Sequence, residues 1–343
     1  MQFVHTPRLP PSSVGARQAL APTLRRAVKG VLLLAVVALL GVVVVNEWSD
    51  VAHVIGSESV ASLAGSTALA LAGTWCSFLS WRALSVDLGG AVPLVGSMRI
   101  FFVGQLGKYV PGKVWPVVAQ MRLGRRYDVP GRISAAAAAI VTLLTFGVGL
   151  LVTAVTFPLL GGDALHRYWW ALLVLPVAVV LLLPPVLNRL LERILRLLRR
   201  EPMPRPLTLA GTGRAVGWAV VMWLLYGAHL LVLLTGAGVP LTAELVVRCT
   251  GAFAASWAIG FLLAFAPAGL GVREIGLVGL LGATVAQPLA VAATLISRLM
   301  LTLADLVWPA LALVAERRTN RPQETLPVPA GNAPNGASLA DLP

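Results

Sequence analysis

The feature that most constrains this chain is a series of uncharged, apolar runs, each long enough to cross a lipid bilayer. Five such runs cover residues 30–46, 59–81, 133–162, 168–188 and 215–243. A helix needs roughly 20 apolar residues to cross about 30 Å of hydrocarbon, and each run must be helical because lipid offers backbone groups no hydrogen bonds. Only 12% of the residues are charged and the mean hydropathy is +0.83, whereas a soluble domain carries about 25% charge. The sequence therefore excludes a soluble enzyme, a disordered chain and a fibrous repeat, and it predicts an all-α polytopic membrane protein.

The positions of the basic residues predict the orientation of the chain. The 27 Lys and Arg against 14 Asp and Glu give a formal charge of +13. Such an excess can indicate nucleic-acid binding, but in so apolar a chain the rule that cytoplasmic loops collect Lys and Arg explains it better. All but Arg167, Arg248, Arg273 and Arg298 fall in segments 1–29, 82–132, 189–214 and 317–321. We therefore expect a multi-pass protein of the cell (plasma) membrane, with both termini in the cytoplasm and no nucleic-acid partner.

Two further apolar regions are interrupted by charges, prolines and glycines. Residues 91–121 start and end beside basic residues and are too short for two crossings, so we expect a broken, re-entrant hairpin. An odd number of crossings must join Arg248 to Arg317. One full span at 289–314 with a second hairpin at 245–287 satisfies this, and so do three full spans. The prediction is about six full transmembrane helices plus two re-entrant hairpins, with eight full spans as the alternative.

The two interrupted regions resemble each other. VGQLGKYVPGK (103–113) aligns without gaps with IGFLLAFAPAG (259–269), which matches Pro111 to Pro267. Three full spans lie between the copies, so the second copy enters from the opposite side, as in the inverted repeats of transporters with a site at the membrane midplane. Proline ends a helix and glycine lets the backbone turn or approach a ligand. We predict helix breaks at Gly104, Pro111, Gly112, Pro267, Gly269 and Gly271, with simple proline kinks as the alternative.

Ionisable residues within apolar sequence are costly and usually face a cavity or one another. Arg298 and Asp305 lie seven residues apart and share a helix face, and Glu274 is a candidate partner for Arg298 or Lys108. A positive cavity would suit an anionic group, with phosphate as the natural candidate. The alternatives are lysines that snorkel to the cytoplasmic interface and an Arg298–Asp305 pair that locks two helices. The ionisable candidates are Lys108, Lys113, Arg273, Glu274, Arg298 and Asp305.

At GKYVPGKVW (107–115) and APAGLGVRE (266–274) the chain resembles the transmembrane region of lysylphosphatidylglycerol synthases, the flippase-like integral membrane protein family. The resemblance covers about residues 30–316. It implies a domain that moves lipids between leaflets, with relatives linked to aminoacylated phosphatidylglycerol, polyprenyl-phosphate sugars and hopanoids. It also implies that each motif forms one functional element. The predicted substrate-binding set is therefore Lys108, Tyr109, Lys113, Trp115, Arg273, Glu274, Arg298 and Asp305.

The resemblance does not extend to the soluble aminoacyl-transfer domain of a full synthase. We expect residues 1–27 to be a disordered basic arm, 28–316 a flippase-like transmembrane domain and 317–343 a disordered tail rich in Pro, Gly and Asn. The sequence shows no nucleophile–base cluster, metal-ligand spacing or phosphate loop, so we expect no enzymatic activity, no metal and no cofactor.

The favoured function is that of a translocase for an anionic or polyprenyl-phosphate-linked lipid, with membrane lipids as partners. One alternative is a non-transporting, lipid-binding partner of a separate lipid synthase or glycosyltransferase. Another is an ion-coupled small-solute transporter.

One amphipathic segment lies between spans, at NRLLERILRLLRR (188–200). A helix there has leucine and isoleucine on one face and arginine mostly on the other. This pattern suits an interfacial helix on anionic cytoplasmic lipid, and an ordinary basic loop is the alternative.

Overall fold

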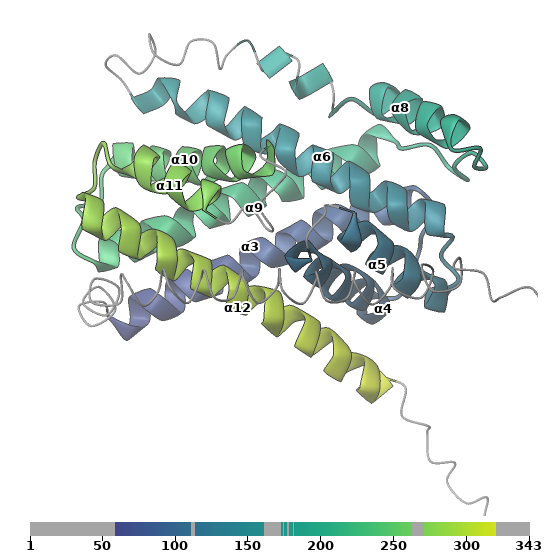
Figure 1. Cartoon of the computed structure of the whole chain (residues 1–343), viewed down its shortest axis with the longest axis horizontal. Helices are drawn as coiled ribbons and strands as arrows, with labels where there is room; N and C mark the ends of the chain where they lie inside the picture. The colour runs from purple at the N-terminus through teal and green to yellow at the C-terminus, as the bar shows by residue number, and fades with distance from the viewer. Residues whose placement is uncertain are drawn as a thin grey trace, which may run out of the picture.

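In the computed structural model, the chain is a bundle of long helices that run roughly alongside one another (Figure 1). The structure describes residues 59–110, 114–160, 182–262 and 271–319, together with residues 173, 175, 176 and 178–180. The regular structure in these ranges is helical and includes no strand, which confirms the all-α class. The predicted span at 30–46, residues 168–172, 174, 177 and 181 of the predicted span at 168–188, the whole N-terminal arm and residues 320–343 of the tail lie outside the described residues.

Five described helices are long and apolar enough to cross a membrane. Four of them match predicted spans, and the fifth belongs to the second interrupted region. The helix α9 begins before predicted residue 215 because Thr208 caps it, accepting a bond from the Gly211 amide at 2.9 Å. The five are α3 (Val60–Asp87), α6 (Gly131–Thr156, followed by a 3-10 turn η4 at Pro158–Leu160), α9 (Leu209–Gly236), α10 (Ala243–Leu262) and α12 (Gln287–Thr319).

The first interrupted region forms a broken helical element between α3 and α6. It consists of α4 (Leu94–Met98), the π-helical η1 (Arg99–Val103), the 3-10 helix η2 (Leu106–Tyr109), α5 (Trp115–Gly124) and the 3-10 turn η3 (Arg125–Tyr127). The second consists of α10 and α11 (Val272–Leu281). The helices α5 and α11 have ten residues each, and at about 15 Å neither can cross a bilayer alone.

The first broken element enters the bundle at the end where α6 and α9 begin. At its base, Arg99 pairs with Glu316 near the end of α12. At its tip, Lys108 pairs with Asp305, which also belongs to α12 and precedes Glu316 by eleven residues. The element therefore runs inward along α12 and breaks inside the bundle.

The second broken element enters from the opposite end, as Figure 1 shows by the separate positions of α10–α11 and α4–α5. At its base, Arg248 donates to the carbonyl of Leu280 at 3.5 Å. Near its tip, the ring of Phe261 contacts that of Phe146, well inside α6, with centroids 5.2 Å apart. The helix α10 is long enough to cross a membrane, and the residues that follow it, 263–270, lie outside the described part of the chain.

The internal repeat is longer than the eleven-residue match in the sequence. The helices α3 and α9 have 28 residues each, and each precedes a broken element and then a long helix. The offset of 156 positions between Pro111 and Pro267 also separates Gly131 and Gln287, the first residues of α6 and α12. Each broken element packs on the long helix of the other copy. The helix α10 packs on α6, and α4 and η1 pack on α12. The first helices of the two copies, α3 and α9, pack on each other. Within the described residues, α3 to α6 and α9 to α12 therefore form two copies of one helical unit.

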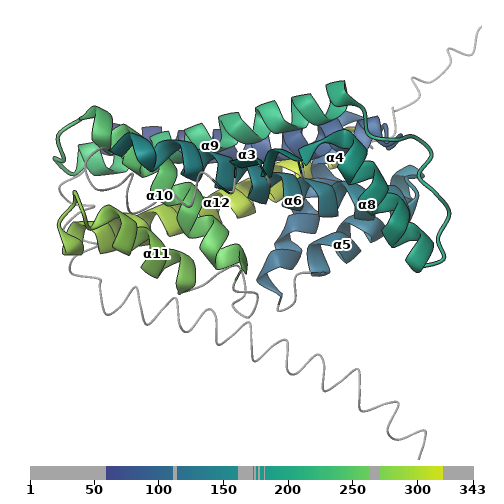
Figure 2. The same cartoon turned by 90° about the horizontal axis from the view of Figure 1, so that it is seen from above.

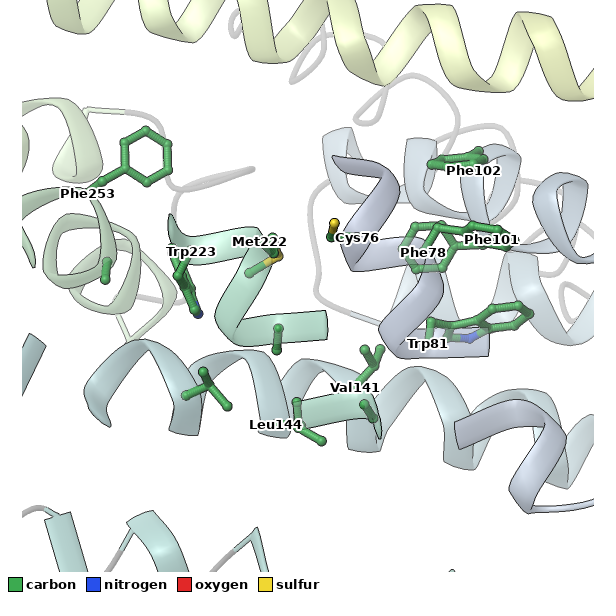
Figure 3. Close-up of a cluster of buried hydrophobic side chains, with 14 of the residues drawn as sticks. Cys76, Phe78, Trp81, Phe101, Phe102, Val141, Leu144, Met222, Trp223 and Phe253 are labelled. Atoms are coloured by element: carbon green, nitrogen blue, oxygen red, sulfur yellow. The ribbon is translucent and has the colours of Figure 1, made fainter. Parts of the chain in front are cut away.

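Aromatic side chains fill much of the space around the broken elements (Figure 3). Phe78 of α3 lies against Phe101 and Phe102 of η1, with ring centroids 5.8 and 5.2 Å apart. Between α9 and α10, small residues allow the two helices to pack closely. A Cβ on Gly227 of α9 would lie only 2.7 Å from the Cα of Thr250 in α10. Such close helix contacts at small residues are typical of membrane bundles.

The helix α8 (Pro184–Leu197) is the predicted amphipathic segment, and it lies at the same end of the bundle as α5 (Figure 2). It begins four residues earlier than predicted because Pro184 and Pro185 occupy its first turn, where no backbone N–H is needed.

Candidate functional site

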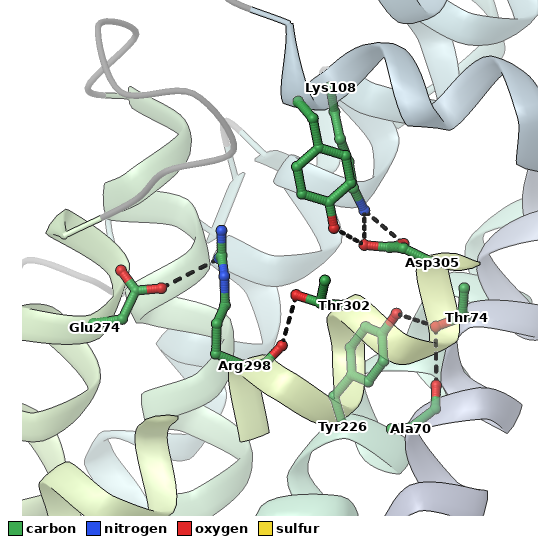
Figure 4. A network of polar contacts seen from close by, with 9 residues as sticks. Ala70, Thr74, Lys108, Tyr226, Glu274, Arg298, Thr302 and Asp305 are labelled. Carbon is green, nitrogen blue, oxygen red and sulfur yellow. Dashed lines mark hydrogen bonds and ion pairs between the residues drawn. The ribbon is translucent and has the colours of Figure 1, made fainter. Parts of the chain in front are cut away.

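The tip of the first broken element is fixed to α12 by a carboxylate. The Nζ atom of Lys108 lies 2.7 Å from Oδ1 and 2.6 Å from Oδ2 of Asp305, and the hydroxyl of Tyr109 donates to Oδ2 at 2.7 Å (Figure 4). The 3-10 helix η2 ends at Tyr109 because the next residue, Val110, is extended, with φ −89° and ψ 131°. This conformation is expected for a residue that precedes a proline.

The tip of the second broken element approaches α12 from the other side (Figure 4). Glu274, in the first turn of α11, pairs with Arg298 at 3.2 Å, one of the two partners predicted for it. Gly271, one of the predicted breaks, caps this helix with a φ of +81°, a conformation that favours glycine. Arg298 and Asp305 do not pair with each other, and α12 is where the two broken elements meet.

Arg273 differs from the two paired cations. Its guanidinium lies over the ring of Phe253, 4.6 Å from the centroid. It is within electrostatic reach of Glu274 and Asp305, but no described carboxylate lies close enough to form an ion pair with it. The described ionisable side chains at the two tips are three cations, Lys108, Arg273 and Arg298, and two carboxylates. The cluster therefore has one positive charge in excess.

A cavity of about 160 Å³ opens beside the Lys108–Asp305 pair of this cluster. It has room for several water molecules or for a small polar group. Its wall combines hydroxyl, amide and aromatic side chains with the Lys108–Asp305 pair. The lining residues central to the argument are Thr74, Gln105, Thr142, Thr145, Trp223 and Tyr226.

The uncharged polar residues of the cavity were not predicted, although the sequence contains a signal for them. Thr142 and Thr145 are three residues apart in an otherwise apolar helix, and so are Thr74 and Ser77. Residues at this spacing share a helix face. The offset of 156 residues between the two copies matches Thr142 of α6 to Arg298 of α12. The repeat is therefore symmetric in its backbone and asymmetric in its charge.

Several predicted site residues stand elsewhere or cannot be placed. Gly104 is not a break, since its φ of −62° and ψ of −39° are helical. Its role is packing, because a Cβ there would lie 2.5 Å from Cγ of Gln120 in α5. Trp115 begins α5, and Gly107 packs against its backbone, where a Cβ would lie 2.8 Å from the carbonyl carbon. The predicted residues Pro111, Gly112, Lys113, Pro267 and Gly269 lie outside the described residues.

A second polar group, not predicted, joins three helices next to Arg298. His229 of α9 is buried, with Nδ1 2.7 Å from Oγ of Ser66 in α3 and Nε2 2.8 Å from Oγ of Ser297 in α12. These bonds fix α12 against the α3–α9 pair at the level where the two broken elements meet.

The sequence profile described as the lysylphosphatidylglycerol synthase TM region matches residues 18–308. The match includes both broken elements, the cavity and α12 as far as Trp308. No curated protein is similar enough to the chain to be matched with it.

Proposed function

The chain belongs to the family of the lysylphosphatidylglycerol synthase transmembrane region, a membrane family linked to lipid handling, and we propose that it is a translocase that moves an anionic lipid between leaflets. Polyprenyl-phosphate-linked lipids are within this class. The protein would do so without enzymatic chemistry or a cofactor.

The observation that carries the proposal is the excess positive charge where the two opposed broken elements meet. Asp305 neutralises Lys108 and Glu274 neutralises Arg298 at the described tips, whereas Arg273 has an aromatic ring beside it and no carboxylate partner among the described residues. An uncompensated charge inside a membrane domain is costly and usually functional. A lipid phosphate would supply the missing charge, and a guanidinium binds phosphate with two parallel hydrogen bonds.

The cavity supports a route for the head group. Hydroxyl and amide side chains such as Thr142 and Gln105 replace the hydrogen bonds of water around a polar head group, while the acyl chains remain in the bilayer. Because the broken elements enter from opposite ends, a rocking motion of one against the other would open the site to each leaflet in turn, as in other transporters built from inverted repeats.

Leaflet exchange of a labelled anionic lipid in proteoliposomes tests the proposal. We expect the wild-type chain to accelerate exchange, Arg273→Gln to abolish the acceleration and Arg273→Lys to retain part of it. Arg248→Gln is the matched control, since Arg248 lies at the base of the same broken element and pairs with Glu244. Full exchange by Arg273→Gln would refute the site. Lipid binding without any exchange by the wild type would favour the non-transporting partner of a separate synthase or glycosyltransferase.

The orientation belongs to the same proposal. We place the end of the bundle with α5 and α8 in the cytoplasm of the plasma membrane, because arginines gather there and the positive-inside rule applies. The native Cys76 and Cys249 are buried, so single cysteines at Arg126 and Glu244 can be labelled selectively. Labelling of Arg126→Cys from outside intact cells would contradict this orientation.

A further inference from the structure

The helix α8 presents an apolar strip that the described part of the bundle does not cover. Leu187, Leu191 and Leu195 are buried, and they follow one another at intervals of four residues along one side of the helix. Ile194 and Leu197 lie beside them on the same face but are exposed, and the exposed fraction of Leu197 is 83%. Only half of the apolar face of α8 therefore packs on the bundle.

The opposite face of α8 carries positive charge without acidic partners. Arginines occupy five exposed positions from the middle of the helix to its C-terminal turn, and none of them forms an ion pair with the described part of the chain. Glu192 is the only acid within the helix. These arginines are Arg189, Arg193, Arg196, Arg199 and Arg200.

One of these arginines occupies a position that suits glycine. The backbone of Arg199 has a φ of +50°, and the amide of Arg200 closes the end of the helix on the carbonyl of Leu195 at 2.8 Å. A left-handed residue at such a helix end is usually glycine because a Cβ is unfavourable there. The chain therefore carries an arginine where glycine would be more stable.

The helix is also held firmly in place. The side-chain amide of Asn188 donates to the carbonyl of Leu207 at 3.0 Å and its oxygen accepts from the Leu207 amide at 2.9 Å. The next residue, Thr208, is bound through its amide and hydroxyl to Asp87 of α3 at 2.7 and 2.8 Å. Both faces of α8 thus have a set direction relative to the long helices.

We propose that α8 is a binding surface for anionic phospholipids of the adjacent leaflet. Its uncovered leucine and isoleucine side chains insert among acyl chains and its arginines contact lipid phosphates. A bilayer interface supplies apolar chains and negative charge side by side, which is the combination that the two faces of α8 require. The inference is independent of transport, since it concerns the membrane surface and none of the residues at the cavity.

Quenching by labelled lipids tests the inference with the full chain in nanodiscs. A fluorophore on Ile194→Cys reports the uncovered apolar strip, and one on Glu192→Cys reports the polar face. We expect lipids with a quencher near the top of the acyl chain to quench the label at 194 and spare the label at 192. In mixed bilayers, quenching at 194 by anionic lipid should exceed that by zwitterionic lipid and fall at high salt. Replacing one arginine should lower the preference for anionic lipid by up to about fivefold.

The variant Arg193→Gln/Arg196→Gln tests the charges, and Arg317→Gln/Arg318→Gln is the matched control. The control removes two exposed arginines at the end of α12 and should leave the preference unchanged. Three results would overturn the inference. They are quenching at 194 by aqueous quenchers alone, protection from both kinds of quencher, which would indicate a covering protein, and equal quenching by anionic and zwitterionic lipids.

Discussion

The carboxylate of Asp305 offers the sharpest test of how the first broken element is held. It accepts from Lys108 and Tyr109 at 2.6 to 2.7 Å, and its side chain is 15% exposed against 37% for Lys108. Exposed pairs contribute about 0–1 kcal/mol, and loss of one partner of a buried pair costs about 3–5 kcal/mol. The intermediate exposure of this pair places Asp305→Leu at about 2–3 kcal/mol of lost stability.

The double variant Lys108→Met/Asp305→Leu should recover most of that loss, to within about 1 kcal/mol of the wild type. Removing both charges leaves neither member of this pair without its partner, and apolar replacements of similar volume are often neutral. Unfolding in mixed detergent micelles, followed by the fluorescence of the 10 tryptophans, gives the four corners of the double-mutant cycle. The coupling between the two sites should be at least about 1.5 kcal/mol.

The pair of Arg132 and Glu201 provides the control. The side chain of Glu201 is 77% exposed, so Glu201→Leu should change stability by less than about 0.5 kcal/mol. The reasoning is refuted if Asp305→Leu is as mild as this control. It is also refuted if the double variant is as unstable as Asp305→Leu alone.

Three further predictions concern packing and backbone geometry, each read from the same unfolding curves. Gly227→Ala should lower stability by more than about 1 kcal/mol because the added Cβ would force α9 and α10 apart. The control is Gly217→Ala on the same helix, where the added Cβ would have no neighbour within 4 Å, so that change should be neutral or stabilising. Gly271→Ala should cost about 1–2 kcal/mol because of its φ of +81°, and Gly279→Ala in α11, which also has open space around it, should not. His229→Ala should cost about 1–3 kcal/mol because it removes the ring nitrogens that bond the buried hydroxyls of Ser66 and Ser297. The Ser66 hydroxyl keeps its bond to the carbonyl of residue 229, and a value near zero would contradict the three-helix role.

Much of the architecture was predictable because membrane helices follow composition. Lipid allows only internally bonded backbone, so the uncharged runs at 59–81, 133–162 and 215–243 had to be helices, and they are α3, α6 and α9. Helix ends were less predictable, since they depend on local caps. Thr208 extends α9 past Arg214, and the two prolines at 184 and 185 begin α8 early.

The site was only partly predictable, for a different reason. Charges within apolar sequence stand out, and so the sequence singled out Lys108, Glu274, Arg298 and Asp305, which form two ion pairs in the structure. The pairing of cations and carboxylates depends on how two segments more than 150 residues apart in the sequence pack against α12. No local sequence pattern specifies this long-range packing. Gly104 shows the same limit, since only the position of α5 reveals that it is a packing contact and not a break.

The sequence by itself determined that this chain is a helical membrane protein with two broken, charge-bearing regions, because bilayer-length apolar runs, prolines and buried charges act through local chemistry. Only the tertiary structure decided that Asp305 and Glu274 neutralise different cations and that Arg273 has no described carboxylate partner. Those outcomes depend on long-range packing, in which α12 receives both broken elements and sets the balance of charge between them.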